Sequence, residues 1–228
     1  MESPAIDVGT APLEPLPRGP HSLPRDVVVT SQRTRILRAL VEVVADKGYA
    51  ATTVADVIGR AGVSRTTFYQ LFKDKEDCFL VAYAAGVEAQ FRKVIQAVES
   101  SDDPLEQIRR NLRAYLAELV AHPAAARAFL LEAAVAGPRA LELRAAVRLR
   151  YAELLRALHG RVRERDGKVP RLPLEVFRAA VAAVDGLVVR WISEGRLAEL
   201  AELEPVAVYV ELALFGVPGA DRELPPSE

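Results

Sequence analysis

Cysteine and histidine are scarce in this chain of 228 residues, which holds one cysteine, Cys78, and three histidines. A single cysteine excludes a disulfide within the chain and a zinc site built from several cysteines. The histidines are far apart in the sequence (His21, His122 and His159), so we expect no metal and no other cofactor.

Motifs of catalysis are also missing. The sequence has no glycine-rich phosphate loop, and no nucleophile, base and acid stand out as a set. A helical di-iron protein would need two Glu-x-x-His motifs, whereas Glu118 and His122 have a different spacing and occur once. We therefore predict no catalytic residue and no enzyme.

Long apolar runs are absent as well. The longest stretch without a charged residue is the ten residues Cys78–Val87, and a membrane span needs about 18 to 20. The N-terminus carries Glu2 and Asp7 and lacks an apolar signal core. We expect a cytoplasmic protein without a membrane partner.

The charge of the chain is unevenly distributed. Half of the residues are hydrophobic and 27% are charged, which permits a sizeable core and excludes global disorder. The net charge of -1 argues against a surface that binds nucleic acid everywhere. However, residues 25–75 hold nine Lys/Arg and five Asp/Glu, a net charge of +4, so the remainder carries -5. A local basic surface is therefore expected.

Proline is concentrated at the two ends of the chain. Residues 1–24 contain six of the fifteen prolines, and residues 217–228 contain three more. Such segments cannot bury enough apolar surface to offset their ordering entropy, so we expect a disordered arm over 1–28 and a disordered tail over 217–228. The short run Val27–Val29 could extend the arm before the first helix.

Between these ends, the pattern of apolar residues is helical throughout. Start and stop signals are regularly spaced, with a capping residue or a proline at helix starts and glycine at helix ends. The sequence predicts an all-α fold of about nine helices. The helix starts are marked by Thr53, Ser64, Asp74, Pro104, Pro123, Pro138, Pro173 and Pro205.

Residues 52–72 form the pattern of a helix-turn-helix. Thr53 can cap a short helix with Asp56 at its third position, and Gly62 permits the positive φ of a tight turn. Ser64 then begins a new helix at once, which forces a large angle between the two helix axes.

The helix after Ser64 has one polar, basic face. At about 100° per residue, its polar side chains fall within an arc of roughly 140°. Arginine, threonine and glutamine can read base edges, whereas tyrosine and lysine can hold phosphates. The alternative is a three-helix subdomain whose polar face is merely solvated. The residues on this face are Arg65, Thr66, Tyr69, Gln70 and Lys73.

This stretch resembles the N-terminal domain of the TetR family of bacterial repressors over about 50 residues. The resemblance rests on Thr53, Ala61–Ser64, Thr67–Tyr69, Phe72 and Lys75. It implies that Thr53, Ser64, Tyr69 and Lys75 touch DNA phosphates, and that Arg65, Thr66 and Gln70 read the major groove.

The chain departs from the family pattern at several positions. Thr66 stands where glycine is common and adds a hydroxyl to the reading face, so base preference cannot be copied from relatives. Leu71 replaces histidine or tyrosine, which can remove a phosphate contact. Cys78 stands at a leucine position and is most simply a core hydrophobe, with a redox role as the alternative.

The two C-terminal helices predict an association surface. They carry apolar stripes, and the last one, Val206–Phe215, is apolar on nearly every side apart from Glu211. Relatives in the family pair these helices in a four-helix bundle, which implies a homodimer; the alternative is a large monomeric core. The expected interface residues are Phe177, Val181, Val184, Val188, Trp191, Val206, Tyr209, Val210 and Phe215.

The middle helices predict an effector pocket. They are rich in small residues, and a few polar groups interrupt their apolar stretches, as expected of a pocket for a small lipophilic molecule. For the two acids, the alternative is a solvated or arginine-paired carboxylate. The candidates are Tyr83, Tyr115, Glu132, Tyr151 and Asp185.

Together, these features predict a DNA-binding domain over 29–89 and an effector-binding and dimerisation domain over 90–216. The expected function is a homodimeric transcriptional regulator of the repressor type. A small lipophilic effector would release it from a palindromic double-stranded DNA operator. Two-fold symmetry would separate the half-sites by about one DNA turn. The alternative is a helical small-molecule-binding protein without affinity for DNA.

Overall fold

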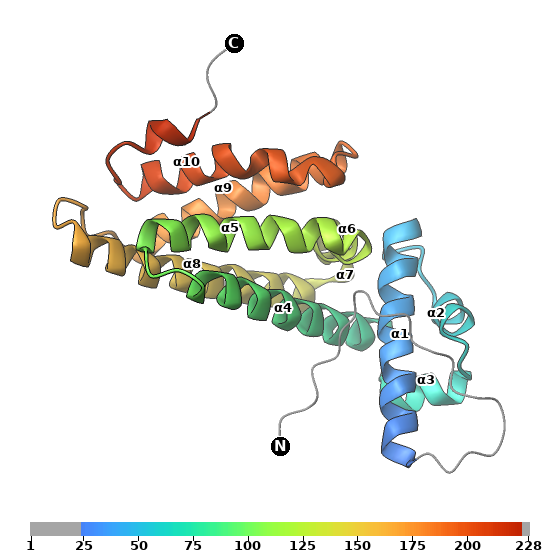
Figure 1. Ribbon diagram of the computed structural model, residues 1–228. Helices are drawn as coiled ribbons and strands as arrows, with labels where there is room; N and C mark the ends of the chain where they lie inside the picture. The colour runs from blue at the N-terminus through green and yellow to red at the C-terminus, as the bar shows by residue number, and fades with distance from the viewer. Residues whose placement is uncertain (1–23, 225–228) are drawn as a thin grey trace. The chain divides into compact units, whose positions relative to one another are not determined.

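The computed structural model describes residues 24–224, and within them every regular element is a helix (Figure 1). The all-α prediction is confirmed, with ten α-helices in the described part of the chain instead of about nine. None of these helices is long and apolar enough to cross a membrane. The helices are α1 (Arg25–Lys47), α2 (Val54–Ala61), α3 (Arg65–Leu71), α4 (Lys75–Glu99), α5 (Pro104–Ala121), α6 (Pro123–Leu131), α7 (Ala133–Ala136), α8 (Pro138–Arg165), α9 (Leu174–Ser193), η1 (Leu197–Leu203), α10 (Glu204–Leu214) and η2 (Ala220–Glu223).

The two terminal segments are shorter than expected. Helix α1 begins at Arg25, so residues 25–28 are helical and Val27–Val29 do not extend an arm. At the other end, η2 forms within the expected tail, where Val217 and Ala220 are buried and Glu223 pairs with an arginine of α5. These contacts offset the entropy of ordering the segment. The rest of both predicted segments lies outside the described residues.

Two helical breaks differ from the sequence prediction. The helix expected from Pro123 to Gly137 is interrupted at Glu132, which separates α6 from α7. Before α10, the chain forms the 3₁₀ helix η1, whose buried residues Leu197, Leu200 and Leu203 recur every third position. A spacing of three matches the 3₁₀ period, so one edge of this helix faces the core.

The described chain divides into two compact units. The first contains the residues up to Ala89 together with 124–143, and the second contains 90–123 and 144–224. The expected continuous domain over 90–216 is therefore interrupted, because α7 and most of α6 pack with the N-terminal helices.

The first unit is built around α1. Its residues Ile36, Leu37 and Leu40 are fully buried, at the helical spacing that the sequence showed. Helix α3 adds Phe68, and α4 adds Phe79, both also without exposed surface. This core fixes α2 and α3 against α1 and so determines which side chains of α3 reach the surface.

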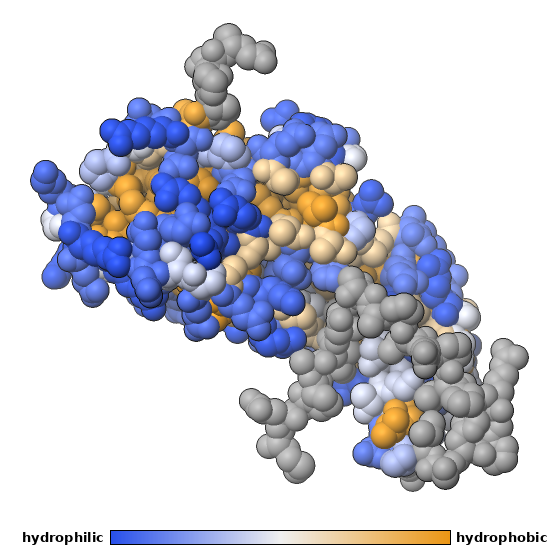
Figure 2. Space-filling view, viewed as in Figure 1, coloured by the Kyte–Doolittle hydropathy of each residue, from blue (hydrophilic) through white to orange (hydrophobic). Residues whose placement is uncertain are grey.

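The second unit packs α5, α9, η1 and α10 against one another (Figure 1). Its largest fully buried side chains include Leu112 of α5, Leu155 of α8 and Phe177 of α9. Figure 2 shows that charged and polar residues occupy most of the visible face and that apolar residues reach it in scattered patches.

Candidate functional site

Helices α2 and α3 each begin with a capping residue. The Thr53 side chain accepts a hydrogen bond from the Asp56 amide, and the Asp56 carboxylate accepts one from the Thr53 amide, which completes a capping box. Hydrogen bonds from Lys47 and Thr53 lower the pKa of Asp56, so this carboxylate stays ionised. Ser64 Oγ accepts a hydrogen bond from the Thr67 amide at 3.0 Å and begins α3.

A left-handed glycine joins the two helices. Gly62 has φ 63° and ψ 42°, and the Val63 amide donates a hydrogen bond to the Ile58 carbonyl. A side chain at this φ would be strained, so glycine is required for the abrupt change of direction. The turn predicted from Ala61–Ser64 is thus present, and it projects α3 away from α2.

Helix α3 exposes the face that the sequence predicted. The five polar and basic side chains are all exposed, whereas Phe68 on the opposite side is fully buried. The Tyr69 ring is 48% exposed and stands edge-on to Phe68, and Arg65 Cζ lies 5.8 Å from the Tyr69 ring centroid. The exposed set is Arg65, Thr66, Tyr69 and Gln70 of α3, together with Lys73, which was expected on the same helix but follows its end at Leu71.

Lys75 was expected to touch a DNA phosphate, but its ammonium binds groups within the chain. Its Nζ donates hydrogen bonds to the carbonyls of Tyr49 at 2.8 Å and Thr52 at 2.9 Å, and it lies 4.0 Å from the centroid of the Tyr49 ring. Burial lowers the pKa of this ammonium, with a smaller effect from Lys47. In this arrangement the ammonium secures the connection between α1 and α2, because two of its three donors are used within the chain.

Glu132 secures the same connection from another side. Its Oε2 accepts a hydrogen bond from the Tyr49 amide at 2.8 Å. A Cβ at Gly48 would lie 3.4 Å from this oxygen, and the φ of Gly48 is 82°. The carboxylate is partly exposed, forms no ion pair with an arginine among the described residues, and accepts its hydrogen bond from the backbone that follows α1. Glu132 thus makes a structural contact with the segment that joins α1 to α2, and its role in an effector pocket stays a prediction.

Tyr83, the other effector candidate of the first unit, belongs to an aromatic cluster. Its ring stacks on Phe129 of α6 with centroids 4.7 Å apart and planes 6° apart. Phe79 stands edge-on to both rings and also to Tyr49. This cluster joins α6 to the start of α4 and to the end of α1.

The second unit holds the other three effector candidates. Tyr151 is buried and stands edge-on to Tyr115 and to Phe91, and its hydroxyl donates to Gln90 Oε1 at 3.3 Å. Burial raises the pKa of Tyr151, so the hydroxyl stays protonated. These rings form a second aromatic cluster, in which both tyrosines carry a hydroxyl group.

Asp185 is an arginine-paired carboxylate, which was the alternative to a pocket role. Its Oδ2 accepts hydrogen bonds from Arg144 Nη2 at 2.8 Å and from Arg148 Nη2. The Asp185 side chain is 10% exposed and that of Arg144 is 13% exposed. The two guanidinium groups satisfy the acid, so this pair links α8 to α9.

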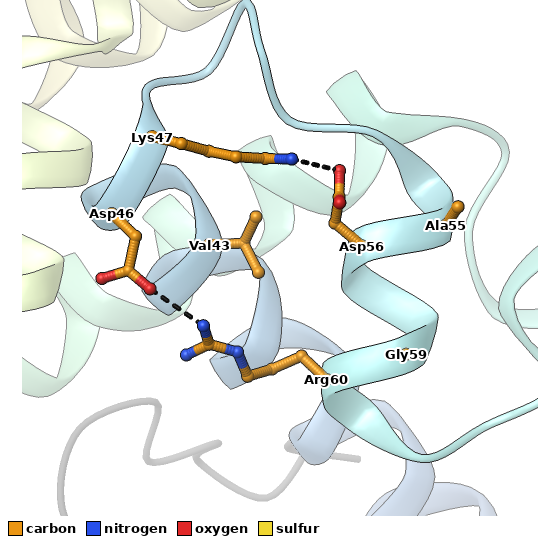
Figure 3. A pocket seen from close by; sticks show the side chains of 7 residues that line it. All are labelled: Val43, Asp46, Lys47, Ala55, Asp56, Gly59 and Arg60. Carbon is orange, nitrogen blue, oxygen red and sulfur yellow. Dashed lines mark hydrogen bonds and ion pairs between the residues drawn. The ribbon is translucent and has the colours of Figure 1, made fainter.

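A hollow of about 330 Å³ lies between α1 and α2. Charged pairs span its wall, with Lys47 Nζ 2.5 Å from Asp56 and Arg60 Nη2 2.9 Å from Asp46 (Figure 3). None of the effector candidates lines it. A shallow site whose charges are already paired does not fit a lipophilic molecule.

The structure separates the expected interface residues into two groups. Four of them lie in the core of the protomer, because α9 and α10 turn these side chains toward each other and toward α8. Phe177 and Val188 are fully buried, and both Phe177 and Phe215 stand edge-on to His159. The assignment to an interface is therefore wrong for Phe177, Val184, Val188 and Phe215, whereas Val181, Trp191, Val206, Tyr209 and Val210 are partly exposed.

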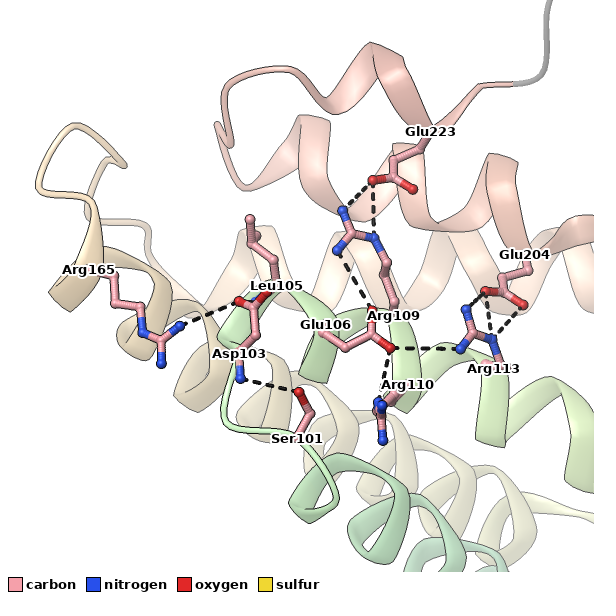
Figure 4. A network of polar contacts seen from close by, with 10 residues as sticks. All are labelled: Ser101, Asp103, Leu105, Glu106, Arg109, Arg110, Arg113, Arg165, Glu204 and Glu223. Atoms are coloured by element: carbon pink, nitrogen blue, oxygen red, sulfur yellow. Dashed lines mark hydrogen bonds and ion pairs between the residues drawn. The ribbon is translucent and has the colours of Figure 1, made fainter.

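Two functional features were not found from the sequence. Arginines of α5 join α10 and η2, with Arg113 paired to Glu204 at 2.7 Å and Arg109 paired to Glu223 at 2.5 Å (Figure 4). In addition, Glu211 is buried, and its Oε2 has no hydrogen-bond partner. The available signal in the sequence was that Glu211 is the lone acid in an otherwise apolar helix. That pattern suggested a polar edge of the helix and gave no sign that the acid is buried.

Cys78 is fully buried, and burial raises the pKa of its thiol. A protonated, inaccessible thiol reacts slowly with oxidants. This environment supports the interpretation of Cys78 as a small core residue.

Comparison with known proteins gives a family match over the helix-turn-helix. Residues 36–82 match the bacterial regulatory proteins of the tetR family. The chain is 32% identical over 95 residues to the transcriptional activator FasR of Mycolicibacterium smegmatis, an alignment that covers 42% of each protein. The chain thus spans less than half the length of this relative.

Two further similarities extend beyond that unit. The chain is 29% identical over 163 residues to the regulator EthR of the same organism, covering 69% of this chain and 71% of EthR. The fold is similar to that of FadR from Bacillus subtilis, solved in complex with stearoyl-CoA, with a TM-score of 0.69 and 19% identity over 80% of this chain and 97% of FadR. Over its helix-turn-helix, the chain is therefore similar to the TetR family of bacterial regulatory proteins.

Proposed function

We propose that this chain is a DNA-binding transcriptional regulator. The observation that carries the proposal is the exposed face of α3, where Arg65, Thr66 and Gln70 are free to meet base edges. Tyr69 and Lys73 on the same face, with Thr53 and Ser64 at the two helix starts, are placed to meet phosphates. For Lys75 we retain only the contribution of its backbone at the start of α4, because its ammonium is bound to carbonyls.

The direct test is selection of bound duplexes from a random pool, followed by titration of the selected duplex at several salt concentrations. We expect affinity that falls steeply with salt, because bound phosphates release counterions. Duplex binding that is undetectable even at low salt would favour the alternative, a helical small-molecule-binding protein without DNA affinity.

We further propose a homodimer that reads a palindrome. The partly exposed residues Val206, Tyr209 and Val210 recur at helical spacing along α10, and Leu214 extends the same side with 41% exposure. An apolar helix face of this kind is usually covered. Sedimentation should show a dimer at micromolar concentration, and Val210→Glu should shift it to monomer. A monomeric wild-type protein would contradict the proposal.

The effector that we propose is small and largely lipophilic. Support comes from the apolar, aromatic character of the second unit around Tyr115 and Tyr151 and from the stearoyl-CoA complex of FadR, which shares the fold. A long-chain acyl thioester is therefore the first molecule to test. It should lower the affinity for the selected duplex, and unchanged affinity at saturating acyl thioester would reject this class of effector.

The proposed direction of regulation is repression, with the effector releasing the operator. FasR is named as an activator, so activation is the alternative direction. A reporter placed behind the selected duplex distinguishes them: deletion of the regulator should raise expression if it is a repressor and lower it if it is an activator.

A further inference from the structure

Three arginines of α1 lack a counter-charge. Arg33, Arg35 and Arg38 are half-buried, and the Nε atom of each is buried without a hydrogen-bond partner among the described residues. None of them forms an ion pair with a carboxylate in the described part of the chain. This is unlike Arg60 of the same unit, which pairs with both Glu42 and Asp46.

Two of these arginines lie at the two ends of α3. Arg35 Nη1 is 3.8 Å from the position that a Cβ would take at Gly62, in the turn before the helix. Arg33 Cζ is 5.9 Å from the ring centroid of Phe72, the residue that ends the helix. The two side chains leave α1 about 200° apart, which fits their positions at opposite ends of α3.

A partly desolvated guanidinium without a counter-charge is unfavourable in the free protein. Burial removes part of its water, and no carboxylate compensates for the loss. A bound phosphate would supply the missing charge and accept hydrogen bonds from the terminal Nη groups, because a guanidinium binds phosphate through paired N–H donors. The position beside a helix that exposes base-reading side chains makes a DNA phosphate the fitting anion.

We propose that Arg33 and Arg35 each bind a phosphate of the DNA backbone, one at each end of α3, and so fix the height and tilt of this helix in the groove. Arg38 follows Arg35 by one helical turn and adds positive potential on the same side. The proposal rests on the proposed DNA-binding function and adds residues of α1 to the contacts that the helix-turn-helix supplies.

The test measures the salt dependence of binding to a labelled duplex of random sequence and to the selected duplex. For the double variant Arg33→Gln/Arg35→Gln, the slope of log affinity against log salt should fall by about 0.9 for each arginine in each bound protomer. Because phosphates carry no sequence information, the preference for the selected duplex should stay unchanged. The variant Arg33→Lys/Arg35→Lys keeps both charges and should retain most of the slope.

Arg60→Gln is the matched control, since it removes one positive charge from the same unit at a paired position. Its slope should stay close to that of the wild type. An unchanged slope for the double glutamine variant would overturn the proposal, as would an equal fall for Arg60→Gln, which would indicate a general effect of charge.

Folding is checked by circular dichroism. If the double variant unfolds because Phe72 loses its cover, Arg35→Gln alone carries the test, since Arg35 lies against a glycine and covers no aromatic ring. Absence of salt-dependent binding in the wild type would instead reject the proposed function itself, so the two failures are distinguishable.

Discussion

The two units of the molecule treat their positive charges differently. In the first unit, Arg65 of α3, Lys73 just after that helix and three arginines of α1 have no ion-pair partner among the described residues. In the second, arginines of α5 bind Glu204 and Glu223 (Figure 4), and arginines of α8 bind Asp185. The difference fits the proposal that unpaired arginines of the first unit contact an anion. In the second unit, paired arginines hold helices of the unit together.

The exception in the second unit is Glu211, an acid that is buried without a partner. Burial raises its pKa to about 8 from 4.5, so the folded chain retains a proton that the unfolded chain releases. Stability should therefore fall as the pH rises through the window from 4.5 to about 8. Between about pH 5 and pH 7, the free energy of unfolding of the wild type should fall by about 3 kcal/mol because of this group. Glu211→Gln cannot ionise, so it should not show this fall.

Urea unfolding at both pH values measures this difference. Glu204→Gln is a suitable control, because that acid is paired with Arg113. Equal pH dependence of the wild type and Glu211→Gln would mean that Glu211 is ionised in the folded protein, and the contrast between paired and unpaired acids in this unit would disappear.

The next largest effect should come from Lys75, whose charge is satisfied by carbonyls instead of carboxylates. Lys75→Met leaves the Tyr49 and Thr52 carbonyls without their donor and should destabilise the chain by about 1–3 kcal/mol. Thermal unfolding tests this, with Lys47→Met as the partly exposed control. A variant as stable as the wild type but weak on every duplex would restore the phosphate role expected from the family resemblance.

A substitution of Arg65 tests whether the unpaired arginine of α3 reads a base. Arg65→Ala should weaken binding to the selected duplex by about 1–3 kcal/mol and relax the preference at one base pair. It should leave stability nearly unchanged, because the side chain is exposed. An equal loss on selected and random duplexes would show that Arg65 holds a phosphate instead of reading a base.

The smallest effect is expected where arginine is already paired. Arg113 is 55% exposed on its side chain, so its pair with Glu204 is screened by water. Arg113→Gln should change stability by less than about 1 kcal/mol and leave the salt slope of DNA binding unaltered. A marked fall in that slope would remove the distinction between the two units.

The local signals in the sequence were sufficient for the helix-turn-helix. Thr53, Gly62 and Ser64 act through neighbours within a few residues, so their roles follow from the order of residues alone. The face of α3 followed equally from helical periodicity, because the buried Phe68 fixes its orientation.

Long-range contacts could not be predicted in the same way. Glu132 meets Tyr49 across 83 positions, and nothing near either residue indicates the other. The apolar stripe of α9 was correctly found, but periodicity does not tell whether it faces the protomer core or a second copy. Val184 and Val188 are therefore buried within the chain, whereas they were expected at an interface.

The contact between Glu132 and Tyr49 bears on the order in which the protein can fold. The first unit draws on two separate stretches of chain, and Phe129 covers Phe79 and Tyr83 only when the second stretch is present. During synthesis, the helix-turn-helix would leave the ribosome well before residues 124–143, with this aromatic surface still open. A nascent chain would thus complete its first unit only after α4 and α5 had been made.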